Sequence, residues 1–487
     1  MSSSKHFVAL VCVAAVVVSL SGVVQAKTYP DGSRSQHQSG FGHSRGHPGL
    51  EREHDDRVFT VQTNADLAFT ALPGASAYWG VYDGIQGPAS YTAEFPDNWN
   101  GRLIMYTHGF RGEGSVVTRE VPNAAFRNTA MALGFAWAAS SYSANFYDVR
   151  AAIEDTNKLA LNLTGYLARD WSVGYDLPAQ YLIAGVSMGG HAAAAAVERE
   201  TIRTARYPVR YAGALPMCQA EQNEFQWLGD YNRVARELAG FGRRPYEDYQ
   251  EYVDQVVSNL FESDENGSTY VPKNKAGELL KAIAMNLTGG KRPIFEEGFR
   301  NPTWQGAVLG TGGSDGTVTG ILAREIYDNT HRIYRWTDGR RPNVWEWVFK
   351  AKVGRFKADR GVNPVRDDGV RWLPLVQGDF NVPVLTMHTL GDFFVPFVHQ
   401  QRYRKAANRN GNGDLLVQRA IRDANHCGFS GAEFSTALVD LITWVDTGIK
   451  PGGDEVLDTD VVADDQYGCA YTDNTLSFGR ESLPQCE

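Results

Sequence analysis

Apolar and polar residues alternate in two rhythms along the first half of the chain. Between residues 58 and 99 the apolar runs are short and are broken by Gly, Pro and Asn, which predicts strands. One of these strands is expected at residues 91–95. Beyond this stretch, strands are expected at residues 102–106, 135–139, 181–186 and 207–215. Helical periodicity appears at residues 124–133 and 149–170, and an alanine-rich helix follows residue 190. Strands that alternate with helices predict a mostly parallel sheet with helical crossovers.

This rhythm stops near Met217 and resumes at Val382. The later pattern predicts a strand at 382–389, a helix at 397–407, a strand at 415–421 and a last helix. That last helix places apolar residues on one face, namely Phe434, Leu438, Leu441, Ile442 and Val445. The core is therefore expected in two parts, 57–217 and 376–450. Between them, residues 218–375 are expected to form an aromatic-rich, mostly helical lid.

The two ends of the chain have a different composition from the core. Lys5 precedes an apolar run from Phe7 to Leu20, and Val24-Gln25-Ala26 resembles a signal-peptidase site. Residues 1–26 are therefore expected to be a signal peptide, with a retained membrane anchor as the alternative. Residues 27–56 are polar and predict a disordered leader. Residues 451–487 predict an acidic, solvated tail. The mature protein is expected to be secreted or periplasmic, with no stable membrane span after processing.

Charge and cysteine content narrow the function class. The formal net charge of −9 and the lack of a basic run give nucleic-acid binding little support. Removal of the signal peptide leaves four cysteines, Cys218, Cys427, Cys469 and Cys486. An even number in an exported protein predicts disulfides, with buried free thiols as the alternative. Cys469 and Cys486 are near neighbours and are expected to pair, which would leave Cys218 for Cys427.

The segment Gly185-Val186-Ser187-Met188-Gly189 carries the strongest chemical signal. An apolar run ends at this Gly-x-Ser-x-Gly pattern, and the alanine-rich helix starts directly after it. Strand, sharp turn and helix are the context of a nucleophile elbow, in which the serine hydroxyl is exposed above the sheet. The glycines leave room for the strained turn. The pattern therefore predicts Ser187 as a nucleophile.

Candidate partners for the serine follow the late strands. Asp392 comes directly after the 382–389 strand, whereas Asp379 precedes that strand and would lie at its other end. The alternative role for Asp392 is to cap the following helix. His426 lies in the loop after the 415–421 strand. The order Ser187, Asp392, His426 is that of α/β-hydrolases and differs from the trypsin and subtilisin orders.

The oxyanion formed during such a reaction requires two amide donors. One is the N–H of the residue after the nucleophile, Met188, and the other comes from the loop after an early strand. His108-Gly109-Phe110 occupies that loop, so Phe110 is the expected second donor and Arg111 the alternative. His108 is expected to have a structural role beneath the loop.

Taken together, these motifs resemble the α/β-hydrolase superfamily over about residues 57–450. Gly391-Asp392 followed by Val395-Pro396 resembles members of the prolyl-oligopeptidase and dienelactone-hydrolase types. The pair His426-Cys427 resembles tannases and feruloyl esterases, in which this cysteine bonds one that precedes the serine. Here Val186 precedes Ser187, so Cys218 is left to tether the His426 loop from another place.

The resemblance implies a serine hydrolase that cleaves carboxylic esters of small molecules or polymers through an acyl-enzyme. Amide or peptide hydrolysis on the same triad is one alternative, and an inactive hydrolase fold used for binding is another. The aromatic residues of the expected lid favour an apolar or aromatic acyl or alcohol group. No metal or organic cofactor is expected, because the chain holds neither His-Glu-x-x-His nor a close Cys/His cluster.

Overall fold

The computed structural model describes residues 57–242, 249–262, 270–312, 326–337, 341–474, 480 and 482–486. The predicted signal peptide and leader, residues 1–56, lie outside the described residues. None of the helices in the described ranges combines the length and the apolar character that a bilayer span requires.

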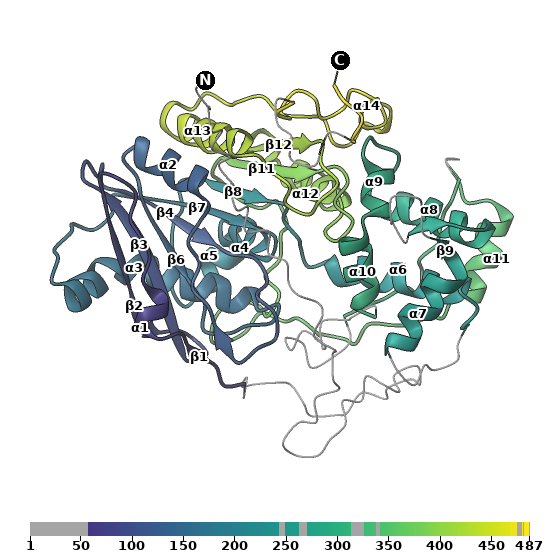
Figure 1. The fold of residues 1–487 in the computed structure, drawn as a ribbon, viewed down its shortest axis with the longest axis horizontal. Coiled ribbons are helices and arrows are strands. Elements are labelled where there is room, and N and C mark those ends of the chain that lie inside the picture. The colour runs from purple at the N-terminus through teal and green to yellow at the C-terminus, as the bar shows by residue number, and fades with distance from the viewer. Residues whose placement is uncertain are drawn as a thin grey trace, which may run out of the picture.

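Eight strands form the central sheet in the order β12-β11-β8-β7-β4-β6-β3-β2 (Figure 1). These strands are β2 (Ala75–Asp83), β3 (Pro88–Pro96), β4 (Arg102–Thr107), β6 (Ala136–Ser140), β7 (Gln180–Val186), β8 (Ala214–Met217), β11 (Val384–Thr389) and β12 (Leu416–Ile421). Strand β3 is antiparallel to both of its neighbours, and the strands from β6 to β12 are parallel. The protein therefore has the α/β-hydrolase fold that the sequence predicted.

Helices cover both faces of this sheet because successive strand residues point to opposite sides. Leu103 and Met105 of β4 share a core with α3 (Val149–Trp171) and α4 (Met188–Ala196). Ile104 and Tyr106 share the opposite core with α2 (Ala124–Ala132) and α13 (Gly431–Thr447). Helix α12 (Val398–Arg409) adds Tyr403 and Ala407 to the α3 face. This packing fixes the carboxyl ends of the parallel strands along one edge.

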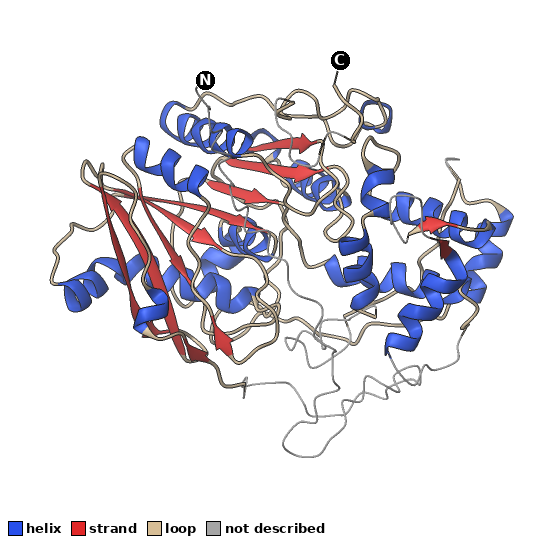
Figure 2. Ribbon diagram, viewed as in Figure 1, coloured by secondary structure: helices blue, strands red, loops and turns tan. Residues whose placement is uncertain are grey.

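The described residues between β8 and β11 form a helical region with its own core, and residues 218–375 are here called the inserted helical region. Its elements are α6 (Glu224–Leu238), α7 (Tyr249–Leu260), β9 (Phe261–Glu262), β10 (Val271–Pro272), α8 (Lys275–Leu287), α9 (Phe295–Arg300), α10 (Pro302–Gly310) and α11 (Val344–Lys352). Figure 2 shows the arrowheads of the parallel strands pointing toward these helices. Phe393, which follows β11, packs into this second core. The region thus lies beyond the carboxyl edge of the sheet.

Several short elements lie outside the central sheet and the inserted helical region. Strand β1 pairs in parallel with β5, and α1 and α5 flank the sheet region. A single 3-10 turn precedes β12, and α14 lies in the last 40 residues. Their bounds are β1 (Thr60–Val61), α1 (Asn64–Leu67), β5 (Val116–Val117), α5 (Arg199–Thr204), η2 (Gly413–Leu415) and α14 (Thr459–Val462).

Two sequence expectations are wrong in their extent. The strand expected at residues 207–215 begins only at Ala214, although Val209 and Tyr211 are buried and produce the alternation. Tyr211 instead donates a hydrogen bond to Asn157 of α3 at 2.7 Å, and Pro208 has no N–H with which to join a ladder.

The second expectation that is wrong in its extent concerns the acidic tail, residues 451–487, which is not solvated throughout. Asp454 accepts a hydrogen bond from the Ala420 amide of β12 at 2.8 Å. Val456, Val462 and Tyr467 are buried in one cluster with Leu390, which directly follows β11. The C-terminal segment therefore covers part of the sheet. The apolar residues spaced among its acidic residues give it a buried side.

Candidate active site

Ser187 lies in the sharp turn between β7 and α4, with φ 57° and ψ −121°. A non-glycine residue at this positive φ is strained, and such strain is typical of a nucleophile elbow. A Cβ atom at Gly185 would lie 2.0 Å from Thr107 Oγ1, and one at Gly189 would lie 2.1 Å from the Thr107 carbonyl oxygen. Both positions therefore require glycine for the turn to pack against β4.

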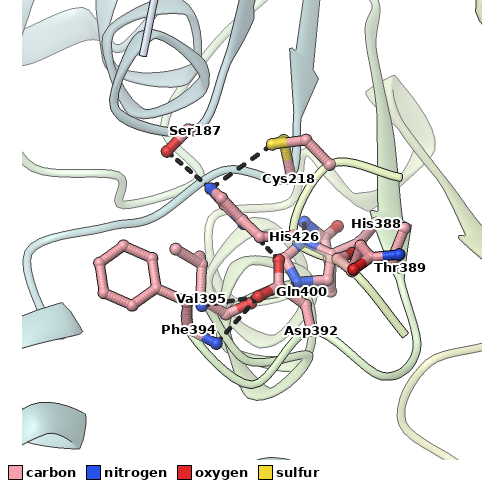
Figure 3. The surroundings of a disulfide bond; sticks show 11 residues. Ser187, Cys218, His388, Thr389, Asp392, Phe394, Val395, Gln400 and His426 are labelled. Atoms are coloured by element: carbon pink, nitrogen blue, oxygen red, sulfur yellow. Dashed lines mark hydrogen bonds and ion pairs between the residues drawn. A yellow bond between two sulfur atoms is a disulfide. The ribbon is translucent and has the colours of Figure 1, made fainter. Parts of the chain in front are cut away.

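The structure brings the three predicted triad residues into one hydrogen-bonded row. His426 Nε2 lies 2.7 Å from Ser187 Oγ, and His426 Nδ1 lies 2.6 Å from Asp392 Oδ2 (Figure 3). The three side chains come from the ends of β7, β11 and β12, so the parallel sheet itself brings them to one edge. The competing acid, Asp379, lies before β11 and pairs with Arg199 at 3.3 Å. The arrangement is able to move a proton from the serine hydroxyl to the imidazole.

Asp392 is fully buried and also shapes its own loop. Its second oxygen, Oδ1, accepts hydrogen bonds from the amides of Phe394 at 3.1 Å and Val395 at 2.8 Å. Helix α12 begins at Val398 and has no side-chain cap, so Asp392 caps the turn rather than the helix. With these bonds and the one to His426, the buried carboxylate is fully satisfied.

The His426 loop is tied down by bonds from distant parts of the chain. A disulfide joins Cys427 to Cys218 at the end of β8, across 209 residues. Thr389 Oγ1 donates to the Asn425 carbonyl oxygen at 2.7 Å, and Asp423 accepts from the Asn425 amide at 2.7 Å. These contacts hold the loop against the ends of β8 and β11.

Beyond this loop, the buried Arg480 pairs with Asp423 at 2.6 Å and with Glu433 of α13 at 2.7 Å. A second disulfide joins Cys469 to Cys486. Cys218, Cys427 and His426 place ligand atoms within 4.8 Å of one another, which is close enough for a metal ion. The two sulfurs are bonded to each other, however, so they are not available as thiolate ligands.

The loop after β4 lies directly against the serine. A Cβ atom at Gly109 would lie 3.2 Å from the Ser187 Cβ. Among the described residues, no oxygen accepts a hydrogen bond from the Phe110 or Met188 amide. Both predicted oxyanion donors are thus unengaged, and their role stays a prediction. The alternative, Arg111, forms an ion pair with Glu120.

His108 supports this loop from beneath, as the sequence predicted. Its ring stacks on Tyr142 with centroids 3.9 Å apart, and its Nδ1 donates to the Gly109 carbonyl oxygen at 2.7 Å. Burial, reinforced by nearby Arg111, lowers the pKa of His108 to about 3, so the ring is neutral. A neutral imidazole with one N–H fits a structural role.

Three other histidines lie near the triad without joining it. His191 and His388 are fully buried, and burial lowers the pKa of each to about 4. His388 Nε2 donates to the Val395 carbonyl oxygen at 2.8 Å and so supports the acid loop. His399 lies between Glu221 and Glu224, at 2.9 and 2.7 Å.

Burial alone would lower the pKa of His399, but its hydrogen bonds to the two carboxylates outweigh burial and leave it raised. The buried ring and the two buried carboxylates beside it thus satisfy one another through hydrogen bonds.

Sequence reasoning missed two aromatic rings that contact His426, the predicted base. Trp304 of α10 lies 5.3 Å from His426 between ring centroids, and Phe394 lies 5.7 Å from it. Both meet the imidazole edge-on, at 75° and 74°. Trp304 is one of many aromatic residues in the inserted region, and nothing in a single sequence distinguishes it. Only the packing of α10 against the His426 loop selects it.

Comparison with known proteins finds a sequence relative that matches a short stretch of the chain. No protein-family model matches the chain. A stretch of 76 residues, 16% of this chain, is 37% identical to an o-phthalyl amidase from Xanthobacter agilis. The match spans 17% of that amidase, so its activity is not transferred to this protein.

Several solved structures match the chain at low sequence identity. A rice cell wall degrading esterase LipA from Xanthomonas oryzae is 12% identical, with 76% of this chain and 87% of that chain covered and a TM-score of 0.34. Feruloyl esterase B from Aspergillus oryzae is 12% identical, with 78% and 89% covered and a TM-score of 0.34. An acylaminoacyl peptidase from Pyrococcus horikoshii is 11% identical, with 81% and 45% covered and a TM-score of 0.36. At these values the likenesses carry no conclusion about substrate.

Proposed function

We propose that this α/β-hydrolase-fold protein is an exported serine hydrolase that cleaves carboxylic esters through an acyl-enzyme. The observation that supports this function most directly is the unbroken hydrogen-bonded row from Ser187 through His426 to Asp392, at 2.7 and 2.6 Å. Nucleophile, base and acid with this geometry are the requirement for acyl transfer at a carbonyl. The strained backbone at Ser187 costs free energy of folding, and such strain is typical of functional sites, which also supports a catalytic role for this serine.

In the proposed reaction, His426 Nε2 accepts the Ser187 proton as Oγ bonds to the ester carbonyl carbon. The amides of Phe110 and Met188 hold the resulting oxyanion. The intermediate then collapses, and the alcohol leaves with the proton from His426. Water attacks the acyl-enzyme by the same route and releases the acid, while Asp392 orients the imidazole and stabilises its charged form. Every proton that His426 accepts is returned, so no cofactor is required.

Amide hydrolysis is the second candidate, and the o-phthalyl amidase relative is the specific observation that favours it. The same triad serves both reactions, since the two differ in the leaving group that His426 must protonate. In either case, the Trp304 and Phe394 rings beside His426 favour substrates with an apolar or aromatic group near the scissile bond. Both small-molecule and polymer esters fit this description.

Export is supported by the sequence of residues 1–26 and by the two disulfides. Disulfides persist in oxidising compartments, which agrees with a secreted or periplasmic protein. We propose that the inserted helical region acts as a lid domain over the edge of the sheet that carries the serine.

Fluorophosphonate labelling of the purified protein tests the proposal. The wild type should be labelled and Ser187→Ala should not, whereas Ser258→Ala, an exposed helix serine, should behave like the wild type. Matched p-nitrophenyl esters and p-nitroanilides of one acyl group then separate esterase from amidase. A folded wild type that neither labels nor turns over these substrates would contradict the proposed function and favour an inactive fold used for binding.

A further inference from the structure

One short segment of the inserted helical region, residues 292–304, contacts both loops that supply the acid and the base. On the acid side, Arg292 is 6% exposed and its Nε donates to the Leu390 carbonyl oxygen at 2.7 Å. In α9, a Cβ atom at Gly298 would lie 1.8 Å from the Gly391 carbonyl oxygen. The helix backbone therefore rests directly on the residue before Asp392, with no room for a side chain between them.

On the base side, the contacts come from the first turn of α10. Asn301 Nδ2 donates to Asn425 Oδ1 at 3.0 Å and to the Ala424 carbonyl oxygen at 3.4 Å. Trp304, one turn along, lies edge-on to His426 at 5.3 Å. Ala424, Asn425 and the ring of His426 are thus all contacted by residues at the start of α10.

From these contacts, and resting on the proposed function, we infer that Asn301 and Trp304 are positioning residues of the catalytic site. They hold the His426 loop and ring so that the imidazole lies between Ser187 and Asp392. The inserted helical region is then part of the catalytic machinery as well as a cover for it. Proton transfer depends on this alignment to within about 0.5 Å, so a small displacement of the ring is costly.

This role differs in its consequences from that of a cover that only shapes the substrate pocket. A pocket wall changes KM, and it matters most for bulky substrates. A positioning residue changes kcat, and it does so even for an ester too small to touch the wall. The smallest convenient substrate, p-nitrophenyl acetate, therefore separates the two roles.

The structure provides a matched pair of variants for Asn301. Its Oδ1 caps α10 by accepting from the Thr303 and Trp304 amides, while its Nδ2 makes the contacts to the His426 loop. Asn301→Ser keeps a helix-capping hydroxyl but is too short to reach the loop. Asn274→Ser is the control, because Asn274 caps α8 in the same way and its amide contacts Asn259, away from the triad.

For Trp304, the comparison is between removal of the ring and a smaller ring. Trp304→Ala removes the edge-on contact with His426, whereas Trp304→Phe keeps an aromatic ring at the same place. We expect kcat for p-nitrophenyl acetate to fall about tenfold in Asn301→Ser and about thirtyfold in Trp304→Ala, with KM nearly unchanged. Trp304→Phe should recover most of the loss, and Asn274→Ser should match the wild type.

A downfield proton NMR resonance from the His426–Asp392 hydrogen bond gives a readout that does not depend on turnover. We expect it to shift or broaden in Asn301→Ser and Trp304→Ala and to stay in place in Asn274→Ser. If the wild type lacks activity but the resonance responds in this way, the proposed function fails and the positioning role stands. If kcat and the resonance both match the wild type in Asn301→Ser and Trp304→Ala, the positioning role is overturned.

Discussion

The turn of Ser187, the proposed nucleophile, and the loops of the proposed acid and base are held in different ways. Ser187 is fixed by its immediate neighbours, since Gly185 and Gly189 let the turn pack against β4. The loop of Asp392 combines local bonds from the Phe394 and Val395 amides with a bond from the distant Arg292 to Leu390, and the loop of His426 depends mainly on distant residues. His426 is held by a disulfide from Cys218, and its ring is contacted by Trp304. The turn of the proposed nucleophile therefore has a local sequence signature, while the contacts that hold the loop of the proposed base have none.

This difference predicts that substitutions at the elbow and in the two loops will have different effects. A disturbance at the elbow alters backbone packing in the centre of the sheet and should reduce the free energy of unfolding. A disturbance of the loops displaces His426 or Asp392 and should reduce kcat first. The following variants test that division, from the largest expected effect to the smallest.

Asp392→Asn should reduce kcat by about 10⁴-fold while the protein stays folded, because an amide favours the wrong imidazole tautomer and cannot stabilise the imidazolium. Steady-state kinetics with p-nitrophenyl esters measure this loss. Asp379→Asn is the control at the opposite end of β11, and it should leave kcat unchanged. A similar loss in both variants would show that the acid has been assigned to the wrong residue.

Replacement of Cys218 and Cys427 by serine should affect both stability and rate. The crosslink spans 209 residues, for which the chain-entropy relation gives about 5 kcal/mol of stabilisation. Since the bond also tethers the loop of His426, kcat should fall about tenfold. Denaturant unfolding and ester kinetics provide the two measurements.

The Cys469–Cys486 bond is the matched comparison, because it closes a span of 17 residues and gives about 3 kcal/mol by the same relation. Its removal should lower stability and leave kcat near the wild-type value. Equal losses of kcat in the two double variants would mean that the Cys218 bond has no special relation to the site.

Gly185→Ala should destabilise the protein by about 3 kcal/mol or more, because the new methyl group would lie 2.0 Å from Thr107 Oγ1. Gly165→Ala in α3 is the opposite case. A Cβ there meets nothing within 4 Å, so this change should stabilise the helix by about 1 kcal/mol. The urea midpoints of the two variants should therefore move in opposite directions, and a tolerated Gly185→Ala would show that the elbow is less constrained than described.

A fall in pH should weaken the contact through which His388 supports the loop of Asp392. Burial lowers the pKa of this histidine from 6.5 to about 4, so between these values the unfolded chain binds the proton more readily than the folded protein does. The free energy of unfolding should thus fall as the pH drops through that window. The loss attributable to His388 between pH 7 and pH 5 is about 2 kcal/mol.

His388→Gln removes the titrating group and should reduce the difference in unfolding free energy between pH 7 and pH 5. His331→Gln, at an exposed histidine, serves as the control. Urea unfolding at the two pH values decides the matter, and an unchanged difference in His388→Gln would mean that other groups, such as His108 and His191, carry the acid sensitivity.

Much of the core was readable from the sequence because its signals are periodic. Strands β4, β6, β7, β11 and β12 and helices α2, α3, α12 and α13 lie within a few residues of their predicted places. Prediction failed where apolar spacing had another cause. Val209 and Tyr211 are buried without strand pairing, and Val456 and Tyr467 give buried positions to a segment whose acids suggested a solvated tail.

What the sequence determined by itself is the fold class, the elbow and the order of Ser187, Asp392 and His426, because these depend on short-range patterns and on the course of a parallel sheet. The tertiary structure alone decided which of the many aromatic residues faces the base and which asparagine holds its loop. Contacts such as Asn301 to Asn425, across 124 residues, leave no local pattern. They exist only because the inserted helices pack against the edge where the strands end.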